Sequence, residues 1–158
     1  MADIKEPENT IVMETTKGTV FIELFPDIAP KHVDRIKKLT RERFYDGCTF
    51  HRVIEGFMAQ TGDRSGTGRE GSSHGSLKSE FSNNQHLRGT CSMARGNNLD
   101  SADSQFFICF GDCPFLNGQY TVWGQVIEGM ESIDRLKRGE PARDPDKIIS
   151  MKVVADVN

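Results

Sequence analysis

One arginine and one glutamine lie among apolar side chains in residues 50–60, which read Phe-His-Arg-Val-Ile-Glu-Gly-Phe-Met-Ala-Gln. An arginine guanidinium stays charged and carries a rigid fork of N–H groups, so it suits the stabilisation of a fixed acceptor better than proton transfer. Residues two apart on a strand share a face, which predicts that Phe50, Arg52 and Ile54 point the same way. His51 then points the other way. The pattern indicates an apolar pocket that contains one positioned hydrogen-bond donor.

Short strand-like runs separated by turn residues must position this pocket. Two segments predict helices, residues 30–39 with Pro30 in the first turn and residues 128–138 with apolar residues at a spacing of three. Eight segments are rich in β-branched or aromatic residues: 11–15, 19–25, 50–54, 57–60, 90–94, 105–110, 121–126 and 148–154. This count predicts a mainly β fold, a closed eight-stranded antiparallel β-barrel capped by two α-helices.

Residues 62–84 interrupt the pattern, because Gly, Ser, Arg and Asn replace almost all apolar side chains there. Long loops in small domains commonly line functional sites. The glycines could suggest a phosphate cradle, but they do not join a strand to the start of a helix as such a cradle requires. We therefore expect turns rather than a phosphate-binding loop.

Length and charge exclude several classes of protein. The chain has 158 residues and a formal net charge of -3, which fits one domain over residues 1–158 and disfavours a nucleic-acid partner. Residues 1–9 are polar and predict a flexible N-terminus without the apolar run of a secretory signal. No window approaches the roughly 18 apolar residues of a membrane span. We expect a cytoplasmic monomer with no membrane contact.

The four cysteines could form two disulfides or a metal site. Three of them lie in or beside apolar runs, and their spacing lacks the paired close ligands of a zinc module. The histidines, at positions 32, 51, 74 and 86, also lack ligand spacing, which disfavours a metal-dependent hydrolase. We expect buried free thiols, no metal and no cofactor.

Three separated blocks resemble the cyclophilin family of peptidyl-prolyl isomerases. They are residues 50–60, the Ser-Met-Ala of 92–94 and the Ser-Gln-Phe-Phe-Ile of 104–108, in the family's order and at compatible spacing. The resemblance spans nearly the whole chain and is closest to the compact bacterial cytosolic form. It implies an eight-stranded barrel with a helix at each end, a substrate groove on its outer surface, and rotation about X–Pro peptide bonds.

The resemblance also implies roles for individual residues, with Arg52 at the position of the catalytic arginine. The walls of the proline pocket fall on Phe57, Met58, Phe107 and Leu116. The contacts to the substrate backbone fall on Gln60, Ala94 and Gln105. The edge of the groove falls on His51 and Arg95. Phe115 and Tyr120 stand where eukaryotic members often carry tryptophan and histidine. Both keep an aromatic surface, but the missing indole N–H predicts weak binding of cyclosporin, the family's typical inhibitor.

Proline-containing peptides and unfolded proteins are the expected partners, and the expected activity assists protein folding. One alternative is a scaffold module that binds proline segments with little turnover, which would not need Arg52. Another is an oligonucleotide-binding barrel, which would need stacking aromatics interleaved with a basic stripe. Taken singly, Phe57, Met58 and Phe107 read as core residues and Arg52 as an ion-pair partner; only the joint pattern favours the site.

Overall fold

Alternating apolar residues build the first hairpin of the structure, a computed structural model that describes residues 4–157. Strand β1 (Thr10–Thr15) pairs with β2 (Gly18–Leu24) in antiparallel register. The inward face of β2, made of Val20, Ile22 and Leu24, is buried. This hairpin lies one strand in from an end of the sheet.

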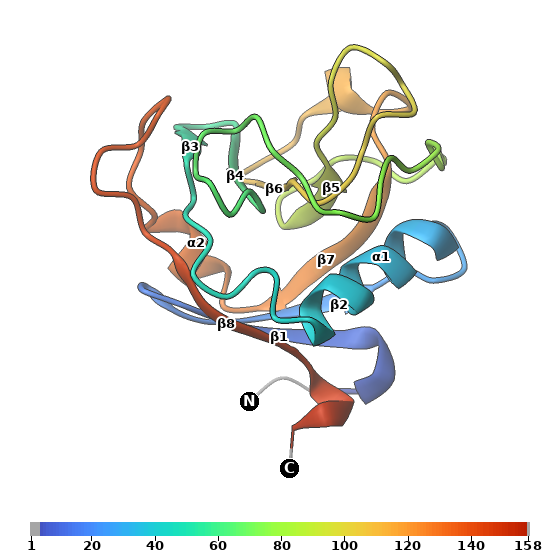
Figure 1. Cartoon of the computed structure of the whole chain (residues 1–158), viewed down its shortest axis with the longest axis horizontal. Coiled ribbons are helices and arrows are strands. Elements are labelled where there is room, and N and C mark those ends of the chain that lie inside the picture. The colour runs from blue at the N-terminus through green and yellow to red at the C-terminus, as the bar shows by residue number, and fades with distance from the viewer. Residues whose placement is uncertain (1–3, 158) are drawn as a thin grey trace.

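Eight antiparallel strands form a single sheet in the order β3-β4-β6-β5-β7-β2-β1-β8. The remaining strands are β3 (Arg52–Ile54), β4 (Met58–Thr61), β5 (Thr90–Met93), β6 (Phe106–Cys109), β7 (Val122–Glu128) and β8 (Ile148–Val153). Every predicted strand therefore exists, with ends that differ by a few residues. Figure 1 shows β1, β2 and β8 in the lower half of the view and β3 to β6 in the upper half.

The sheet curls into an open half-barrel, so the predicted closure is wrong. Strands β3 and β8 are the two edges of the sheet. Within residues 4–157, isolated bridges and single hydrogen bonds take the place of a ladder here. Thr49 pairs with Lys147 and Val53 with Gly139, and Ile148 N–H donates to Cys48 O at 2.8 Å. A continuous ladder cannot form because β3 has three residues and the segment facing it turns back on itself between Gly139 and Ala142.

Two α-helices accompany the sheet. Helix α1 (Pro30–Arg41) starts at the predicted proline and buries Val33, Ile36 and Leu39. Helix α2 (Met130–Asp134) is shorter than the predicted segment 128–138. It starts after Gly129 at φ 93 and gives way to tighter turns in which Leu136 N–H donates to Ile133 O at 3.1 Å. Three 3₁₀ turns complete the elements: η1 (Pro7–Asn9), η2 (Pro114–Leu116) and η3 (Val154–Asp156).

Strand β6 contributes side chains to two apolar clusters, because its side chains alternate between the two faces of the sheet. Phe106 and Ile108 belong to the main core, where Phe106 meets Trp123 edge-to-face at 5.3 Å. Phe107 and Cys109 point to the opposite face of the sheet and join a second, smaller cluster. Because side chains alternate along a strand, one strand supplies both the interior and a patch on the outer surface.

The cysteine prediction is confirmed, since all four thiols are free and buried. Burial raises the pKa of Cys48 to about 11, which leaves that thiol protonated near neutrality. Within residues 4–157, no cluster of His, Cys, Asp and Glu could hold a metal ion, and no helix has the length and apolar character to cross a bilayer.

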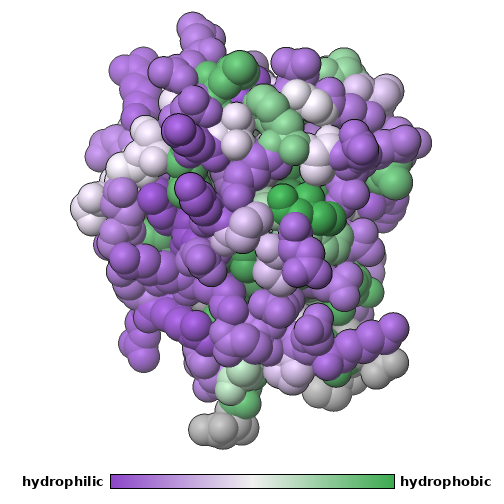
Figure 2. Space-filling model, turned by 90° about the vertical axis from the view of Figure 1, so that its right-hand side faces the viewer, coloured by the Kyte–Doolittle hydropathy of each residue, from purple (hydrophilic) through white to green (hydrophobic). Residues whose placement is uncertain are grey.

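The predicted flexible terminus lies partly in residues 1–3, outside the described residues. Within the described part of it, Glu8 forms ion pairs with Lys37 and Arg41 of α1. Figure 2 shows one face of the molecule as mostly hydrophilic, with small apolar patches separated from one another.

Candidate active site

The second apolar cluster opens into a pocket of about 130 Å³ on the outer face of β3, β4 and β6. Nine predicted site residues line it: Arg52, Phe57, Met58, Gln60, Ala94, Arg95, Phe107, Leu116 and Tyr120. At roughly 30 Å³ for each water in the liquid, the space equals about four waters. A pocket of this size suits one small ring rather than a drug-sized ligand, which needs about 300 Å³ or more.

The floor of the pocket is apolar and firmly packed. Met58, Phe107 and Leu116 are buried, and the Phe107 ring meets Tyr120 edge-to-face at 5.7 Å. On its other side Phe107 stacks on His86 at 6.1 Å. The ring of Phe107 is thus held between two partners, which fixes the shape of the floor.

Arg52 forms the polar side of the pocket and is held by two acceptors. It lies opposite Gln60 in the β3–β4 pair and donates from Nη1 to Gln60 Oε1 at 3.2 Å. Its Nε donates to Glu140 Oε2 at 2.8 Å. The third nitrogen, Nη2, has no hydrogen bond to any described residue, so its N–H groups remain available to a ligand.

A chain of amides continues from Arg52 along the sheet. Gln60 Nε2 donates to Gln105 Oε1 at 2.9 Å, and Gln105 Nε2 donates to the carbonyl of Glu70 at 3.0 Å. Gln105 lies in a neighbouring cavity of about 330 Å³ that shares Gln60, Ala94 and Arg95 with the pocket. The two hollows therefore form one continuous binding surface.

Arg95 and Tyr120 close the side of the pocket away from Arg52. The Arg95 guanidinium lies over the Tyr120 ring at 4.4 Å and donates to the Gln119 carbonyl at 2.7 Å. Phe115 stands outside the pocket with 67% of its surface exposed, although its ring is 5.5 Å from Phe57. It is therefore an aromatic edge rather than a wall.

One prediction about strand β3 needs correction. Phe50 is fully buried in the main core and does not share the face of Arg52 and Ile54. Regular strand geometry starts only at Arg52, so the two-residue alternation does not extend back to Phe50. His51 is buried and does not line the pocket; a Cβ on Gly68 would lie 3.3 Å from its ring. Burial lowers the pKa of His51 and favours the neutral imidazole.

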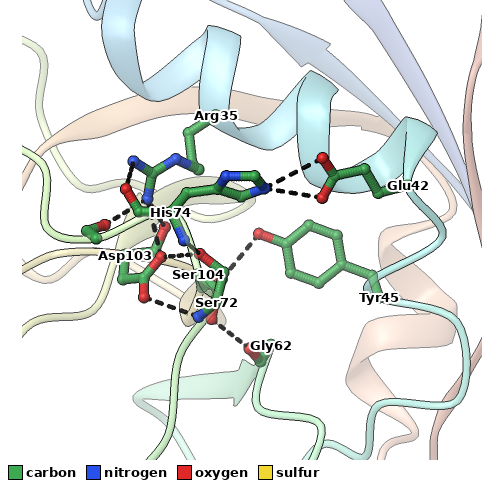
Figure 3. Close-up of polar contacts among 9 residues, drawn as sticks. Arg35, Glu42, Tyr45, Gly62, Ser72, His74, Asp103 and Ser104 are labelled. Carbon is green, nitrogen blue, oxygen red and sulfur yellow. Dashed lines mark hydrogen bonds and ion pairs between the residues drawn. The ribbon is translucent and has the colours of Figure 1, made fainter.

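Polar contacts hold the long loop that borders the neighbouring cavity. Asp103 accepts hydrogen bonds from Arg35 of α1 at 2.8 Å and from the Ser72 backbone at 2.8 Å, as Figure 3 shows. The same view shows Tyr45 donating to the Ser104 carbonyl and Ser104 donating to the Gly62 carbonyl, both at 2.8 Å. These bonds tie the loop to the start of β6, next to Gln105.

Asp63 orders the first turn of that loop. Its carboxylate accepts bonds from the backbone N–H groups of Ser65, Gly68 and Glu70. Burial alone would raise the pKa of Asp63, but these bonds and the Ser65 hydroxyl lower it to about 2. The glycine-rich segment is thus an ordered loop, consistent with turns rather than a phosphate cradle.

Sequence reasoning missed Glu140 and His86. Glu140 lies in an exposed turn far along the chain, and no motif links it to Arg52. His86 was set aside for lack of metal-ligand spacing, yet its ring supports Phe107 while its nitrogens meet Ser92 Oγ and Asn117 Oδ1 at 2.8 and 3.0 Å. Only the Phe107–His86 contact in three dimensions could have found it.

These features define a mainly β protein, an open half-barrel whose small pocket lies on the outer face of the sheet with Arg52 and Arg95 in its lining. The family model "Cyclophilin type peptidyl-prolyl cis-trans isomerase/CLD" matches residues 10–154. The chain belongs to this family. It is a peptidyl-prolyl cis-trans isomerase, and the scaffold alternative is not favoured.

Individual relatives agree with this assignment. A "Probable peptidyl-prolyl cis-trans isomerase" of Brucella suis is 50% identical, with 98% of this chain and 87% of the relative covered. A "Peptidyl-prolyl cis-trans isomerase" of Synechococcus elongatus is 42% identical, with 92% and 96% covered. Sequence likeness therefore extends over almost the full length of these isomerases.

Solved structures show the same fold. Cyclophilin AquaCyp293 from Hirschia baltica matches with a TM-score of 0.90 and 32% identity, covering 97% of this chain and 76% of that one. A Cryptosporidium parvum cyclophilin solved in the presence of the dipeptide Ala-Pro matches with a TM-score of 0.85 and 28% identity, covering 91% and 98%. The second structure associates this fold with a proline-containing ligand.

Proposed function

We propose that the pocket beside Arg52 holds the proline ring of an X–Pro peptide and that Arg52 is the catalytic residue. The observation that carries the proposal is the combination of a firmly packed apolar floor with a guanidinium nitrogen that no described residue occupies. The Ala-Pro dipeptide present with the related Cryptosporidium protein supports a proline-containing substrate.

The reaction needs a donor rather than a nucleophile. Rotation about an X–Pro bond takes tens to hundreds of seconds unaided, because twisting destroys amide resonance at a cost of about 18–20 kcal/mol. The prolyl nitrogen regains its lone pair as the bond twists. A hydrogen bond from Arg52 to that nitrogen exists mainly in the transition state, and such differential binding lowers the barrier.

The remaining residues hold the peptide so that rotation occurs about one bond. Phe57, Met58, Phe107 and Leu116 grip the ring, while Gln60, Gln105 and the Ala94–Arg95 backbone bind the flanking chain. If these effects together lower the barrier by about 7 kcal/mol, the acceleration is on the order of 10⁵-fold. His51 then lies behind the site as a neutral support of the loop.

Cyclosporin should bind weakly, since Phe115 offers an aromatic edge but no N–H donor. Replacing Phe115 with tryptophan restores a donor, and one hydrogen bond is worth about 1 kcal/mol, or about fivefold in affinity. Titration calorimetry with Phe115→Trp and Phe115→Leu measures the difference. Equal affinities in the two variants would contradict this proposal.

We also propose that the enzyme works as a cytoplasmic monomer that assists the folding of proline-containing chains. Four unpaired thiols suit a reducing compartment. No described feature requires a second copy of the chain to complete the pocket.

The location of the substrate can be mapped by NMR. Titration with a short X–Pro peptide should shift the methyl signals of Met58, Ala94 and Leu116, because they line the pocket. The methyls of Ile11 and Val153, buried on the far side of the sheet, serve as controls and should not move. Shifts confined to residues outside the pocket would overturn the assignment.

A further inference from the structure

The free edge of strand β3 is covered by the turn made of residues 139–142. Val53 and Gly139 exchange two backbone hydrogen bonds, each 2.8 Å, and Ala142 N–H donates to His51 O at 3.0 Å. These bonds engage the residues on both sides of Arg52. The turn is therefore in register with the strand, and Glu140 lies beside Arg52.

A glycine lets this turn stay tight. Gly139 has φ +149, and a Cβ there would lie 2.5 Å from Ala142 Cα and 2.7 Å from Pro141 O. Any other residue at position 139 would push the turn open and carry Glu140 away from Arg52. The backbone of residues 139–142 therefore helps to place the Glu140 carboxylate beside Arg52.

Glu140 and Gln60 hold two different nitrogens of the Arg52 guanidinium. Glu140 accepts from Nε at 2.8 Å and Gln60 accepts from Nη1 at 3.2 Å. Two bonds to a planar group restrict its rotation, and a free arginine side chain otherwise samples many rotamers. What remains for a ligand is Nη2.

The ion pair does little for the stability of the fold. The side chains of Arg52 and Glu140 are 41% and 57% exposed, and exposed ion pairs contribute little to the free energy of unfolding. A carboxylate beside a catalytic cation also weakens the positive field that the substrate meets. Its benefit must therefore come from orientation.

We propose that Glu140 is a positioning residue that orients the Arg52 guanidinium so that Nη2 points to the prolyl nitrogen. This inference rests on the proposed catalytic role of Arg52. Glu140 does not touch the peptide, so it changes the rate of rotation in the bound peptide and not the affinity.

The test compares cis–trans exchange of a saturating X–Pro peptide, measured by NMR, in wild type and variants. Glu140→Ala should slow exchange of the bound peptide by about tenfold, the effect of one lost hydrogen bond to a charged group, with less than about a twofold change in peptide Kd. Glu140→Gln retains an acceptor and should recover part of the rate. Glu55→Ala is the matched control, because Glu55 pairs with Arg138 on the neighbouring turn and should leave exchange unchanged.

Combination with Arg52→Ala separates the inference from the function on which it rests. Glu140→Ala should cost nothing further in an Arg52→Ala background, since no guanidinium remains to be oriented. A second tenfold loss there, or faster exchange in Glu140→Ala alone, would overturn the positioning role. Full exchange in Arg52→Ala alone would instead overturn the proposed catalytic residue.

Discussion

The side chain of Arg52 combines two properties that are usually separate. It is a permanent cation, and it faces an apolar floor. Two acceptors, Glu140 and Gln60, and strand β3 fix its position. A donor with a fixed position need not reorganise when charge or a lone pair develops in the transition state, which is the main advantage of such sites. The chemistry of the site therefore follows from placement rather than from reactivity.

The pH profile tests this view at the level of single residues. Turnover should stay constant within about twofold between about pH 6 and pH 8, because arginine does not titrate there. Burial lowers the pKa of His51 below its ordinary value, which favours the neutral imidazole in this range. The measurement is kcat/KM for one X–Pro peptide across the range, and a bell-shaped profile would contradict a donor-only mechanism.

Residue types and motif order predicted most of the pocket but not Glu140, one of the two acceptors that hold Arg52. Nine predicted residues line one pocket, because strand alternation and the resemblance both constrain them. Phe50 was misplaced because regular alternation begins only at Arg52. Glu140 was missed because its position depends on a turn folded against β3, and no local pattern in the sequence encodes that contact.

At the level of elements, strand β6 and the loop over residues 62–84 decide the geometry of the site. Strand β6 sends Phe106 into the core and Phe107 into the pocket, so the packing of the interior fixes the pocket floor. The loop over residues 62–84 reaches the start of β6 through Ser104, which bonds to the Gly62 carbonyl at 2.8 Å. The lack of hydrophobic periodicity predicted a loop here but not its conformation, because carboxylates and backbone amides order it.

The substitution Gly62→Ala tests whether this loop positions the start of β6. At φ +99, a Cβ on Gly62 would lie 2.6 Å from Ser104 O and 2.9 Å from Gln105 Cα, so Gly62→Ala must displace the start of β6. We expect peptide affinity to fall about tenfold, since Gln105 moves away from Gln60 and one or two hydrogen bonds are lost. Titration of the peptide by calorimetry measures the change.

Gly75→Ala is the matched control for that variant. Gly75 also has positive φ, at +83, but nothing lies within 4 Å of a Cβ there. It should lose only about 1–2 kcal/mol of unfolding free energy to backbone strain and keep wild-type affinity. If the two variants bind peptide equally well, the loop does not position Gln105.

At the level of the whole molecule, the open half-barrel explains why the site lies outside. The main core fills the concave side of the sheet, so the outer face of β3, β4 and β6 is left to build a shallow pocket. The number and type of strands were predictable from the sequence, while closure was not. Closure depends on whether β3 and β8 can pair, and the turns between residues 139 and 147 prevent it.

Acid should destabilise the fold before its carboxylates titrate. Burial lowers the pKa of His32, His51 and His86 below the ordinary value of a histidine. At a pH between the native and the unfolded pKa, the unfolded chain therefore binds more protons than the native one. The free energy of unfolding should therefore fall as pH drops from 6.5 to 5.5, by up to about 1 kcal/mol for each histidine, and level off above pH 6.5. Urea unfolding at these pH values checks the sign, and stability that is constant or rises on acidification would contradict it.

The central claim is that Arg52 contributes to the transition state and not to binding. The most direct measurement is the exchange rate of an X–Pro peptide at saturation in wild type, Arg52→Ala and the exposed control Arg143→Ala, with peptide Kd determined alongside. We predict that Arg52→Ala loses about 10²- to 10³-fold in rate, as expected for removal of one transition-state donor, while Kd changes less than about threefold and Arg143→Ala behaves as wild type. A loss of affinity that accounts for the whole loss of rate would contradict the account.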